Sequence, residues 1–377
     1  MARLGDVATY VNGFAFKPTD WSDEGLPIIR IQDLTGNSYQ ANRYNGPYHP
    51  KYEVNDGDVL ISWSASLGVY IWKGEKAVLN QHIFKVVFDK AEVDKNFFVH
   101  QVQNILENAA SEAHGATMKH LTKPVFDALP FYLPSIEKQQ AIASVLDKVS
   151  ELISLRKEQL AKLDQLVKAR FVELFVATDA ASDWPYCTIA DVSNDMRTGP
   201  FGSALHHDEF VDSGVFVLGI DNAVENKFSY NRMRYITAEK YRELKRYTVY
   251  PGDVIITIMG TVGRSAVIPA DMPKAINTKH LACITPNAKM VNAQFLSCAF
   301  QVHPDIRAQL QKQCKGAIMD GLNLTIIKGL SFHIPPINLQ DRFVGFYEHV
   351  DKSKLTIQQS LDKLEVMKKA MMQEYFG

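Results

Sequence analysis

Two stretches decide the fold. Residues 133–175 read LPSIEKQQAIASVLDKVSELISLRKEQLAKLDQLVKARFVELF, and residues 334–376 read IPPINLQDRFVGFYEHVDKSKLTIQQSLDKLEVMKKAMMQEYF. Beyond the prolines at their starts neither contains proline, and Gly345 is the only glycine in either. Because proline disfavours the helical conformation in the residue before it, a helix starts after it. The stretches therefore predict two long helices, from Ile136 to about Phe175 and from Ile337 to about Phe376.

Apolar residues recur along both predicted helices with the heptad period of a coiled coil. In the first helix they are Leu146, Val149, Ile153, Leu160, Leu163, Val167 and Leu174. In the second they are Tyr347, Val350, Ile357, Leu361, Leu364, Met371 and Tyr375. At about 1.5 Å per residue, a helix of about 40 residues spans roughly 60 Å.

We call the apolar row of each helix its seam. Charged residues interrupt each seam at positions where the other helix has an apolar residue. Arg156 and Arg170 align with Ile357 and Met371, whereas Lys354 and Lys368 align with Ile153 and Val167. Neither helix makes a good seam with its own copy, so pairing between the two is favoured. We expect an antiparallel intramolecular coiled coil; the alternative is two separate amphipathic helices, each packed on its own domain.

The two stretches belong to a longer internal repeat, in which residues 115–175 align without gaps with residues 316–376. Upstream the likeness weakens, although residues 55–62 still parallel residues 250–257. We therefore expect a pseudo-twofold repeat: a first domain over residues 1–135, a helix over 136–178, a second domain over 179–335 and a helix over 336–377. The similar C-terminal parts of the two repeats predict one shared function that occurs twice. The diverged N-terminal parts predict two different functions of the same kind.

Both diverged domains are predicted to be mixed α/β. Short strands rich in β-branched residues are expected at residues 26–31, 58–63, 82–88, 215–220 and 253–258. Helices are expected at residues 96–108 and 293–301. The fold class is therefore mixed α+β domains in two copies, joined by two long helices.

Composition favours an ordinary globular protein, with 46% hydrophobic and 22% charged residues and a formal net charge of −1. No apolar run approaches the ~20 residues that span a bilayer, and the N-terminus has no signal-peptide core, so we expect a cytoplasmic protein. Since a protein held on DNA by nonspecific electrostatics is usually strongly basic, any DNA-binding charge here must be local or come from partners.

Catalytic and metal-binding motifs are not found in the sequence. There is no CxxC pair, no GxxxxGK[ST] loop and no GxGxxG, and the single Pro-Pro pair follows Ile334 instead of forming an Asn/Asp-Pro-Pro-Tyr/Phe motif. The adjacent His206 and His207 face different ways and lack partners at metal-ligand spacing. We expect no catalytic site, no metal and no cofactor bound by this chain.

Several strings, in this order and in duplicate, resemble the specificity subunits of Type I restriction-modification systems. They are NGFAFK at 12–17, IIRIQD at 28–33, GDVLIS at 57–62, LNQH at 79–82, TGPFGSAL at 198–205 and GDVIITIMGTVG at 252–263. The resemblance covers nearly the whole chain. It implies two target-recognition domains that each read half of a bipartite, asymmetric DNA target, with the helix pair setting the spacer.

The resemblance also implies partners. These are double-stranded DNA, two modification subunits that methylate adenine N6 with S-adenosylmethionine, and restriction subunits that use ATP and Mg²⁺. Two other classes stay open: a standalone nuclease or methyltransferase with a degenerate site, and a coiled-coil adaptor that binds only protein. A related methyltransferase or nuclease system without a separate restriction subunit is a further variant.

Base reading needs side chains that match base edges, such as Arg or Lys for guanine and Asn or Gln for adenine. The DNA-contact candidates of the first half are Lys17, Arg30, Gln32, Ser62, Trp63, Ser64, Asn80, Gln81, His82 and Lys119. Those of the second are Ser203, His206, His207, Asp221, Asn222, Arg232, Arg234, Thr261, Arg264, Asn277, Lys279 and His280. For each one alone, a turn, a cap or an ordinary surface position is an equal alternative. The basic, tyrosine-rich stretch 227–250 is either a phosphate-facing surface or a solvated amphipathic helix.

Overall fold

A computed structural model describes residues 1–377 except 38–41, 65, 113–121, 202–203 and 315–321. The chain divides into two compact units. Unit 1 comprises Met1–Glu158 and Gln358–Gly377, and unit 2 comprises Gln159–Ile357. Each unit thus contains one α/β domain and about half of each long helix.

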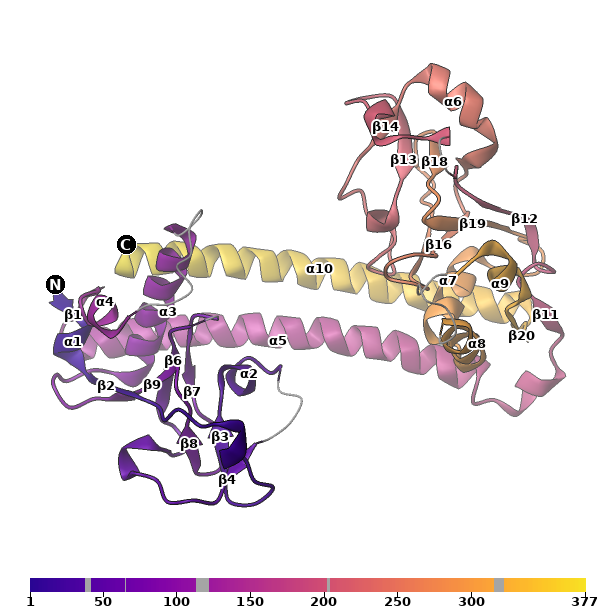
Figure 1. Cartoon of the computed structure of the whole chain (residues 1–377). Coiled ribbons are helices and arrows are strands. Elements are labelled where there is room, and N and C mark those ends of the chain that lie inside the picture. The colour runs from indigo at the N-terminus through magenta and orange to yellow at the C-terminus, as the bar shows by residue number, and fades with distance from the viewer. Residues whose placement is uncertain (38–41, 65, 113–121, 202–203, 315–321) are drawn as a thin grey trace. The chain divides into compact units, whose positions relative to one another are not determined.

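The two long helices have the predicted bounds: α5 runs over Ile136–Phe175 and α10 over Ile337–Phe376 (Figure 1). Within unit 1, the early α5 residue Leu146 shares a buried cluster with the late α10 residue Met372. Within unit 2, the late Phe171 of α5 shares a cluster with the early Phe343 of α10. The helices are therefore antiparallel in each unit, which confirms the expected pairing.

The predicted seams are the least exposed rows of both helices, and the interrupting charges are only half-buried on them. Lys354 Nζ lies 2.5 Å from Asp164 Oδ1 in unit 2, and Lys157 Nζ lies 2.8 Å from Glu365 Oε1 in unit 1. Because these pairs are largely exposed, they contribute little stability, on the order of 0–1 kcal/mol each. They do fix which residues of α5 and α10 face each other.

The described residues of unit 1 form two four-stranded sheets and a two-stranded one (Figure 1). The first sheet has the antiparallel order β2-β9-β6-β7, formed by Thr9–Asn12, Ile83–Val87, Val59–Ser62 and Gly68–Ile71. The second has the order β4-β3-β8-β5, formed by Arg43–Tyr44, Leu26–Ile29, Ala77–Leu79 and Glu53–Val54. In it β3 and β8 are parallel. The two-stranded sheet pairs β1 (Ala2–Arg3) with β10 (Pro130–Phe131).

Unit 2 repeats this topology strand for strand. The first sheet has the order β12-β19-β16-β17, formed by Ser193–Thr198, Leu281–Pro286, Val254–Thr257 and Ser265–Val267. The second has the order β14-β13-β18-β15, formed by Tyr235–Ile236, Val215–Leu218, Ala275–Asn277 and Thr248–Val249, with β13 and β18 parallel. Strand β11 (Tyr186–Thr188) pairs with β20 (Ser331–His333). The fold class, two mixed α/β domains with long coiled-coil helices, is confirmed.

Helices complete each unit. In unit 1 they are α1 (Leu4–Val7), α2 (Ile31–Leu34), α3 (Lys95–Glu112), α4 (Lys123–Asp127) and the 3-10 turns η1 (Pro18–Asp20) and η2 (Pro50–Tyr52). In unit 2 they are α6 (Ala238–Leu244), α7 (Ala293–Val302), α8 (Pro304–Cys314), α9 (Leu324–Gly329), η3 (Asp179–Asp183), η5 (His207–Glu209), η6 (Ile220–Asn222) and η7 (Lys245–Tyr247). No described helix is long and apolar enough to cross a membrane.

The strand expected at residues 26–31 is wrong in its last residues. Strand β3 ends at Ile29, and α2 begins at Ile31. The reason is local: Asp33 Oδ2 accepts from the backbone N–H of Arg30 at 2.8 Å, which caps a short helix. Strand β13 ends at Leu218 for the same reason, since Asn222 Oδ1 accepts from the N–H of Gly219 at 2.8 Å.

A buried glutamine near the start of each long helix holds the helix to its domain. Gln139 and Gln340 are 1% and 0% exposed. The Gln139 amide accepts from the N–H of Asp94 and donates to the carbonyls of Pro134 and Glu92. The Gln340 amide accepts from the N–H of Asn292 and donates to the carbonyls of Pro335 and Met290. Both repeats therefore have glutamine at this position because its amide makes the same kind of hydrogen bonds in each unit.

Candidate nucleic-acid interface

One edge of each domain gathers polar residues from segments far apart in sequence. In unit 1, Ile29 pairs in parallel with Leu79, so Arg30 and the turn Asn80–His82 leave the sheet at the same edge. In unit 2, Leu218 pairs in parallel with Asn277, so η6 and the turn 278–280 leave together. Parallel strands place their carboxyl ends side by side, which explains why both edges form. We call these two places the first and second reading edges.

A glycine holds the turn of each reading edge against the preceding loop. A Cβ atom at Gly13 would lie 2.0 Å from the carbonyl oxygen of Asn80. A Cβ atom at Gly199 would lie 2.2 Å from the carbonyl carbon of Thr278. Because backbone cannot yield as a flexible side chain does, only glycine allows this close approach. Both turns are thereby fixed in place.

The strand registers make the two edges comparable residue by residue. Leu79 corresponds to Asn277, so Asn80, Gln81 and His82 correspond to Thr278, Lys279 and His280. Arg30 and Gly219 are equivalent because each donates its backbone N–H to the side chain three residues later. Gln32 is therefore equivalent to Asp221. The backbone N–H groups of Lys17 and His206 both donate to a carboxylate three residues later, at 2.7 and 2.6 Å, which makes these two residues equivalent. The two edges thus share their strand pairing and caps and differ in side chains, and their backbones differ at the end of the turn, where His82 but not His280 has a positive φ.

The second reading edge is concave. A cavity of about 480 Å³ lies over it. Seven of the predicted contact residues line the cavity: His206, His207, Asp221, Arg232, Arg234, Lys279 and His280. The carboxylate of Asp221 pairs with the guanidinium of Arg234 at 2.5 Å, whereas Arg232 and Lys279 make no ion pair within the described part of the chain. The cavity therefore has a net positive lining suited to an anionic or electron-rich ligand.

Burial sets the charge of one histidine in this cavity. Desolvation lowers the pKa of His280 from its ordinary value, and the neighbouring Lys279 and Arg234 lower it further. His280 is therefore neutral at pH 7. Its Nδ1 lies 3.3 Å from the sulfur of Met259, which places the β16–β17 turn next to the second reading edge.

The first reading edge is less charged and more aromatic. The guanidinium of Arg30 lies 5.5 Å from the ring centroid of Trp21, and its Nε lies 3.9 Å from Asp33 Oδ2. Trp63 stacks on Phe84, and its Nε1 donates to Asn12 at 3.3 Å. Lys17 is exposed at the start of η1. Trp21 directly follows the turn Pro18–Asp20, and no motif in the sequence marked it as part of this edge.

Aromatic rings close to the first edge form a pocket of about 160 Å³ that sequence reasoning also missed. Its lining residues are Phe14, Phe16, Tyr44, Pro47, Tyr48, His49 and Tyr52. Phe14 belongs to the edge itself, since its backbone carbonyl accepts from the N–H of Gln81 at 2.8 Å. Residues 44–52 repeat tyrosine at every fourth position, at Tyr44, Tyr48 and Tyr52, but this spacing does not by itself indicate a pocket.

Four predicted contacts lie inside the domains instead of on an edge. Ser62, Asn222 and Asn277 are 0% exposed and Ser64 is 5% exposed. Ser62 Oγ donates to the carbonyl of Ser64, and the amides of Asn222 and Asn277 donate to the carbonyls of Ser229 and Leu281. These side chains satisfy local backbone groups, so we leave them out of the proposed contact surface.

The other predicted residues have varied positions. Gln32, Asn80, Gln81 and His82 are half-exposed on the first edge. Thr261 and Arg264 are exposed on the β16–β17 turn, which contacts the second edge through Met259. Lys119 and Ser203 lie outside the described residues. The structure thus brings most of the predicted residues to two edges, while contact with DNA stays a prediction.

The basic stretch 227–250 is partly neutralised by ion pairs within unit 2. Lys240 pairs with Glu209 and Glu243, and Arg242 lies 3.7 Å from Glu239. The stretch is not one helix, since it contains β14, α6, η7 and β15. A solvated amphipathic helix therefore accounts only for α6, and Arg232 is the cation of this stretch that lines the cavity without an ion pair among described residues.

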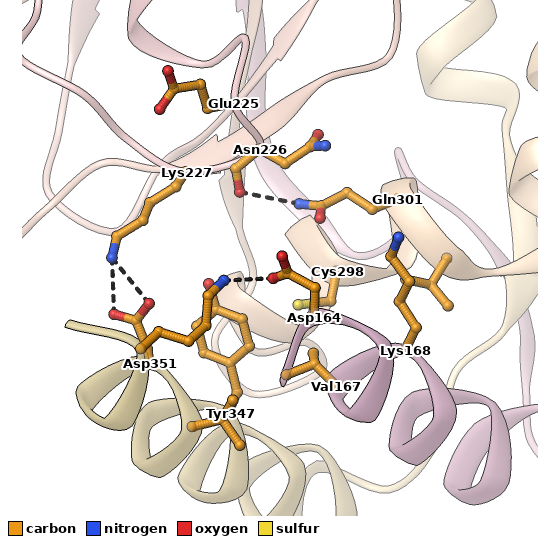
Figure 2. A pocket seen from close by; sticks show the side chains of 13 residues that line it. Asp164, Val167, Lys168, Glu225, Asn226, Lys227, Cys298, Gln301, Tyr347 and Asp351 are labelled. Carbon is orange, nitrogen blue, oxygen red and sulfur yellow. Dashed lines mark hydrogen bonds and ion pairs between the residues drawn. The ribbon is translucent and has the colours of Figure 1, made fainter. Parts of the chain in front are cut away.

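A second cavity in unit 2, of about 210 Å³, lies where the domain meets the long helices (Figure 2). Lys227 Nζ contacts both carboxylate oxygens of Asp351 at 2.9 and 3.0 Å. Burial raises the pKa of the Cys298 thiol to about 12, so the thiol stays protonated. The ion pairs Lys227–Asp351 and Lys354–Asp164 line this cavity, which indicates an anchoring contact between the domain and the two helices. No group of three or more potential metal ligands occurs among the described residues.

A duplicated α/β domain with two long helices, and with one polar edge on each copy, defines a class of two-domain proteins that have one candidate recognition surface on each domain. The family model described as Type I restriction modification DNA specificity domain matches residues 1–165 and 182–366. The chain therefore belongs to the Type I restriction-modification DNA specificity family, whose members recognise DNA sequence.

Individual relatives agree. The chain is 25% identical over 375 residues to the Type I restriction enzyme EcoBI specificity subunit of Escherichia coli, covering 92% of this chain and 78% of the relative. It is 20% identical over 394 residues to the MjaVIII specificity subunit of Methanocaldococcus jannaschii, covering 99% and 90%. The solved S subunit from M. genitalium superposes with a TM-score of 0.57 at 15% identity, covering 100% of this chain and 95% of that one. This last likeness concerns the fold alone.

Proposed function

We propose that each α/β domain reads one half of a bipartite, asymmetric DNA target through its reading edge. The observation that carries this proposal is the pair of edges with equivalent backbones and different side chains, such as Gln32 against Asp221 and Gln81 against Lys279. A shared backbone presents side chains to the same feature of the duplex, and different side chains select different bases. The two halves of the target therefore differ in sequence.

The long helices set the distance between the halves. Each has 40 residues, which at about 1.5 Å per residue corresponds to roughly 60 Å. Half-site separation is a geometric consequence of how far apart two recognition elements are held. The unspecified spacer of the target therefore has one fixed length.

The helices also dock the catalytic partners. Large apolar side chains remain exposed on them: Leu152 at 44%, Leu155 at 47%, Leu166 at 47%, Leu355 at 58% and Val366 at 71%. Exposed apolar residues on a solvated helix favour protein–protein contact. The partners we propose are two methyltransferase subunits, which bind S-adenosylmethionine and methylate adenine N6, and restriction subunits that use ATP and Mg²⁺. This chain itself contributes recognition and no catalysis, and it acts in the cytoplasm.

Base-resolution mapping of N6-methyladenine tests the proposal. DNA is taken from cells that express this chain together with a Type I methyltransferase subunit, and from cells that express that subunit alone. We expect a split motif, two short specified parts around a fixed gap, only when this chain is present. A continuous motif, or methylation independent of this chain, would instead favour a coiled-coil adaptor that binds only protein.

A further inference from the structure

We infer that Gln81 and Lys279 occupy the same base-reading position in the two domains, and that Gln81 selects adenine and Lys279 selects guanine. The inference rests on the proposed function and adds the chemistry of one base in each half of the target. It follows from the equivalence of the two backbones, the rigidity of the two turns and the surroundings of the two side chains.

The equivalence comes from hydrogen bonds as well as strand register. The N–H of Asn80 donates to the carbonyl of Ile29 at 3.1 Å, and the N–H of Thr278 donates to the carbonyl of Leu218 at 3.0 Å. These bonds extend the parallel pairing by one residue in both domains. Gln81 and Lys279 are the next residues in each turn, so the first reading edge presents an amide where the second presents an ammonium group.

Both turns are rigid on either side of this position. The Gly13 and Gly199 contacts hold the preceding peptides, as described above. On the other side, the carbonyl of His82 accepts from the N–H of Trp63 at 3.3 Å, and the carbonyl of His280 accepts from the N–H of Ile258 at 3.0 Å. A side chain on a fixed backbone discriminates between bases better than one on a loop that must first become ordered.

The neighbouring positions offer less discrimination. The next residue is histidine in both domains, so it cannot distinguish the two half-sites. Asp221 is engaged by Arg234, and Arg30 lies against Trp21 and Asp33. Arg30 and Asp221 are thus committed to partners within their own domains, whereas Gln81 and Lys279 differ from each other and make no side-chain hydrogen bond or ion pair within the described part of the chain.

The side-chain chemistry assigns the bases. Lys279 is exposed, lines the positively charged cavity and makes no ion pair within the described part of the chain. An ammonium group donates only, and guanine presents two acceptors, O6 and N7, in the major groove. The half-exposed Gln81 amide carries both a donor and an acceptor, which match N7 and N6 of adenine.

Exchanging the two residues tests the inference. Wild-type chain, Gln81→Lys and Lys279→Gln are each expressed with the methyltransferase subunit, and N6-methyladenine is mapped at base resolution. We expect Gln81→Lys to change one adenine of the first half-site to guanine, and Lys279→Gln to change one guanine of the second to adenine. Each preference should shift by roughly 5- to 150-fold, the range for one good base contact. The half-site of the unaltered domain should stay as in wild type.

Matched controls make the same chemical changes away from the edges. Lys289→Gln is an exposed position in unit 2, and Gln140→Lys is an exposed position near the start of α5. Both should leave the motif unchanged. If an exchange abolishes methylation, Gln81→Ala and Lys279→Ala replace it, and these should accept more than one base at a single position of the corresponding half-site.

The outcomes separate this inference from the proposed function. If wild-type chain gives no split motif, the proposed function itself is wrong. If the motif is split but the exchange and alanine variants keep the wild-type base requirement, or the wild-type halves lack the assigned adenine or guanine, the inference alone is overturned. A single-position change confined to the predicted half supports both.

Discussion

Shortening both long helices by one heptad should shorten the spacer of the DNA target by about three base pairs. The ion pairs define where to cut, since Lys157 faces Glu365 and Asp164 faces Lys354. Removing residues 157–163 from α5 and residues 359–365 from α10 deletes the first pair whole and leaves the second intact. The heptad register continues across both junctions, because seven residues are removed from each seam.

The magnitude follows from helix geometry. Seven residues at about 1.5 Å each shorten the helix pair by about 10.5 Å. At roughly 3.4 Å per base pair along the duplex, this corresponds to about three base pairs. Both half-sites should keep their sequences, because neither reading edge is touched.

The assay is methylation mapping in cells, supported by methylation in vitro of DNA substrates whose gap is shortened by one to five base pairs. The wild-type chain should prefer its own gap, and the double deletion should prefer a gap about three base pairs shorter. A double deletion that methylates with the wild-type gap would refute the idea that the helices set the spacer. Deleting the heptad from α5 alone puts the seams out of register, so this control should lose methylation with every gap.

Two further predictions concern stability. Replacing Gln340 by alanine should lower the free energy of unfolding by about 2–5 kcal/mol, because it leaves buried backbone groups without their three hydrogen bonds. Thermal or denaturant unfolding checks this, and the exposed Gln359→Ala, which should change stability by less than about 0.5 kcal/mol, is the control; equal effects would contradict the anchoring role. Desolvation lowers the pKa of His100 from its ordinary 6.5, although Asp147 at 2.7 Å opposes the shift. A lowered folded-state pKa means that the unfolded chain binds more protons, so this contribution to stability is present above about pH 6.5 and is lost as the pH falls below it. Unfolding at pH 7 and pH 5 should show a smaller acid destabilisation in His100→Asn than in wild type, and an equal loss in both would rule out His100 as its source.

Part of the candidate site could be predicted from the sequence because short stretches of neighbouring residues indicate its turns and strands. Gly57 and Gly252 lie directly before two predicted strands, where glycine favours a turn, and both have φ of +84°. The strands that follow them were predicted within one residue of β6 and β16. Gln81 and Lys279 were predicted contacts because their side chains can match base edges, although the strands that precede them, β8 and β18, were not predicted. The aromatic pocket around Tyr44 and the Arg30–Trp21 contact were missed, since both depend on loops whose path no short-range pattern encodes.

The sequence by itself determined the duplicated architecture and the two long helices with their seams and bounds. These features follow from periodicity, proline positions and self-similarity, all of which are readable along the chain. Only the tertiary structure decided which residues share an edge and which are buried. Parallel pairing of β3 with β8 joins residues some fifty positions apart, and together with the pairing of β13 with β18 it shows that Thr278 corresponds to Asn80. Asn277 and Ser62 look like any exposed polar residue in the sequence, yet both are fully buried, because burial depends on what the rest of the chain packs around a residue.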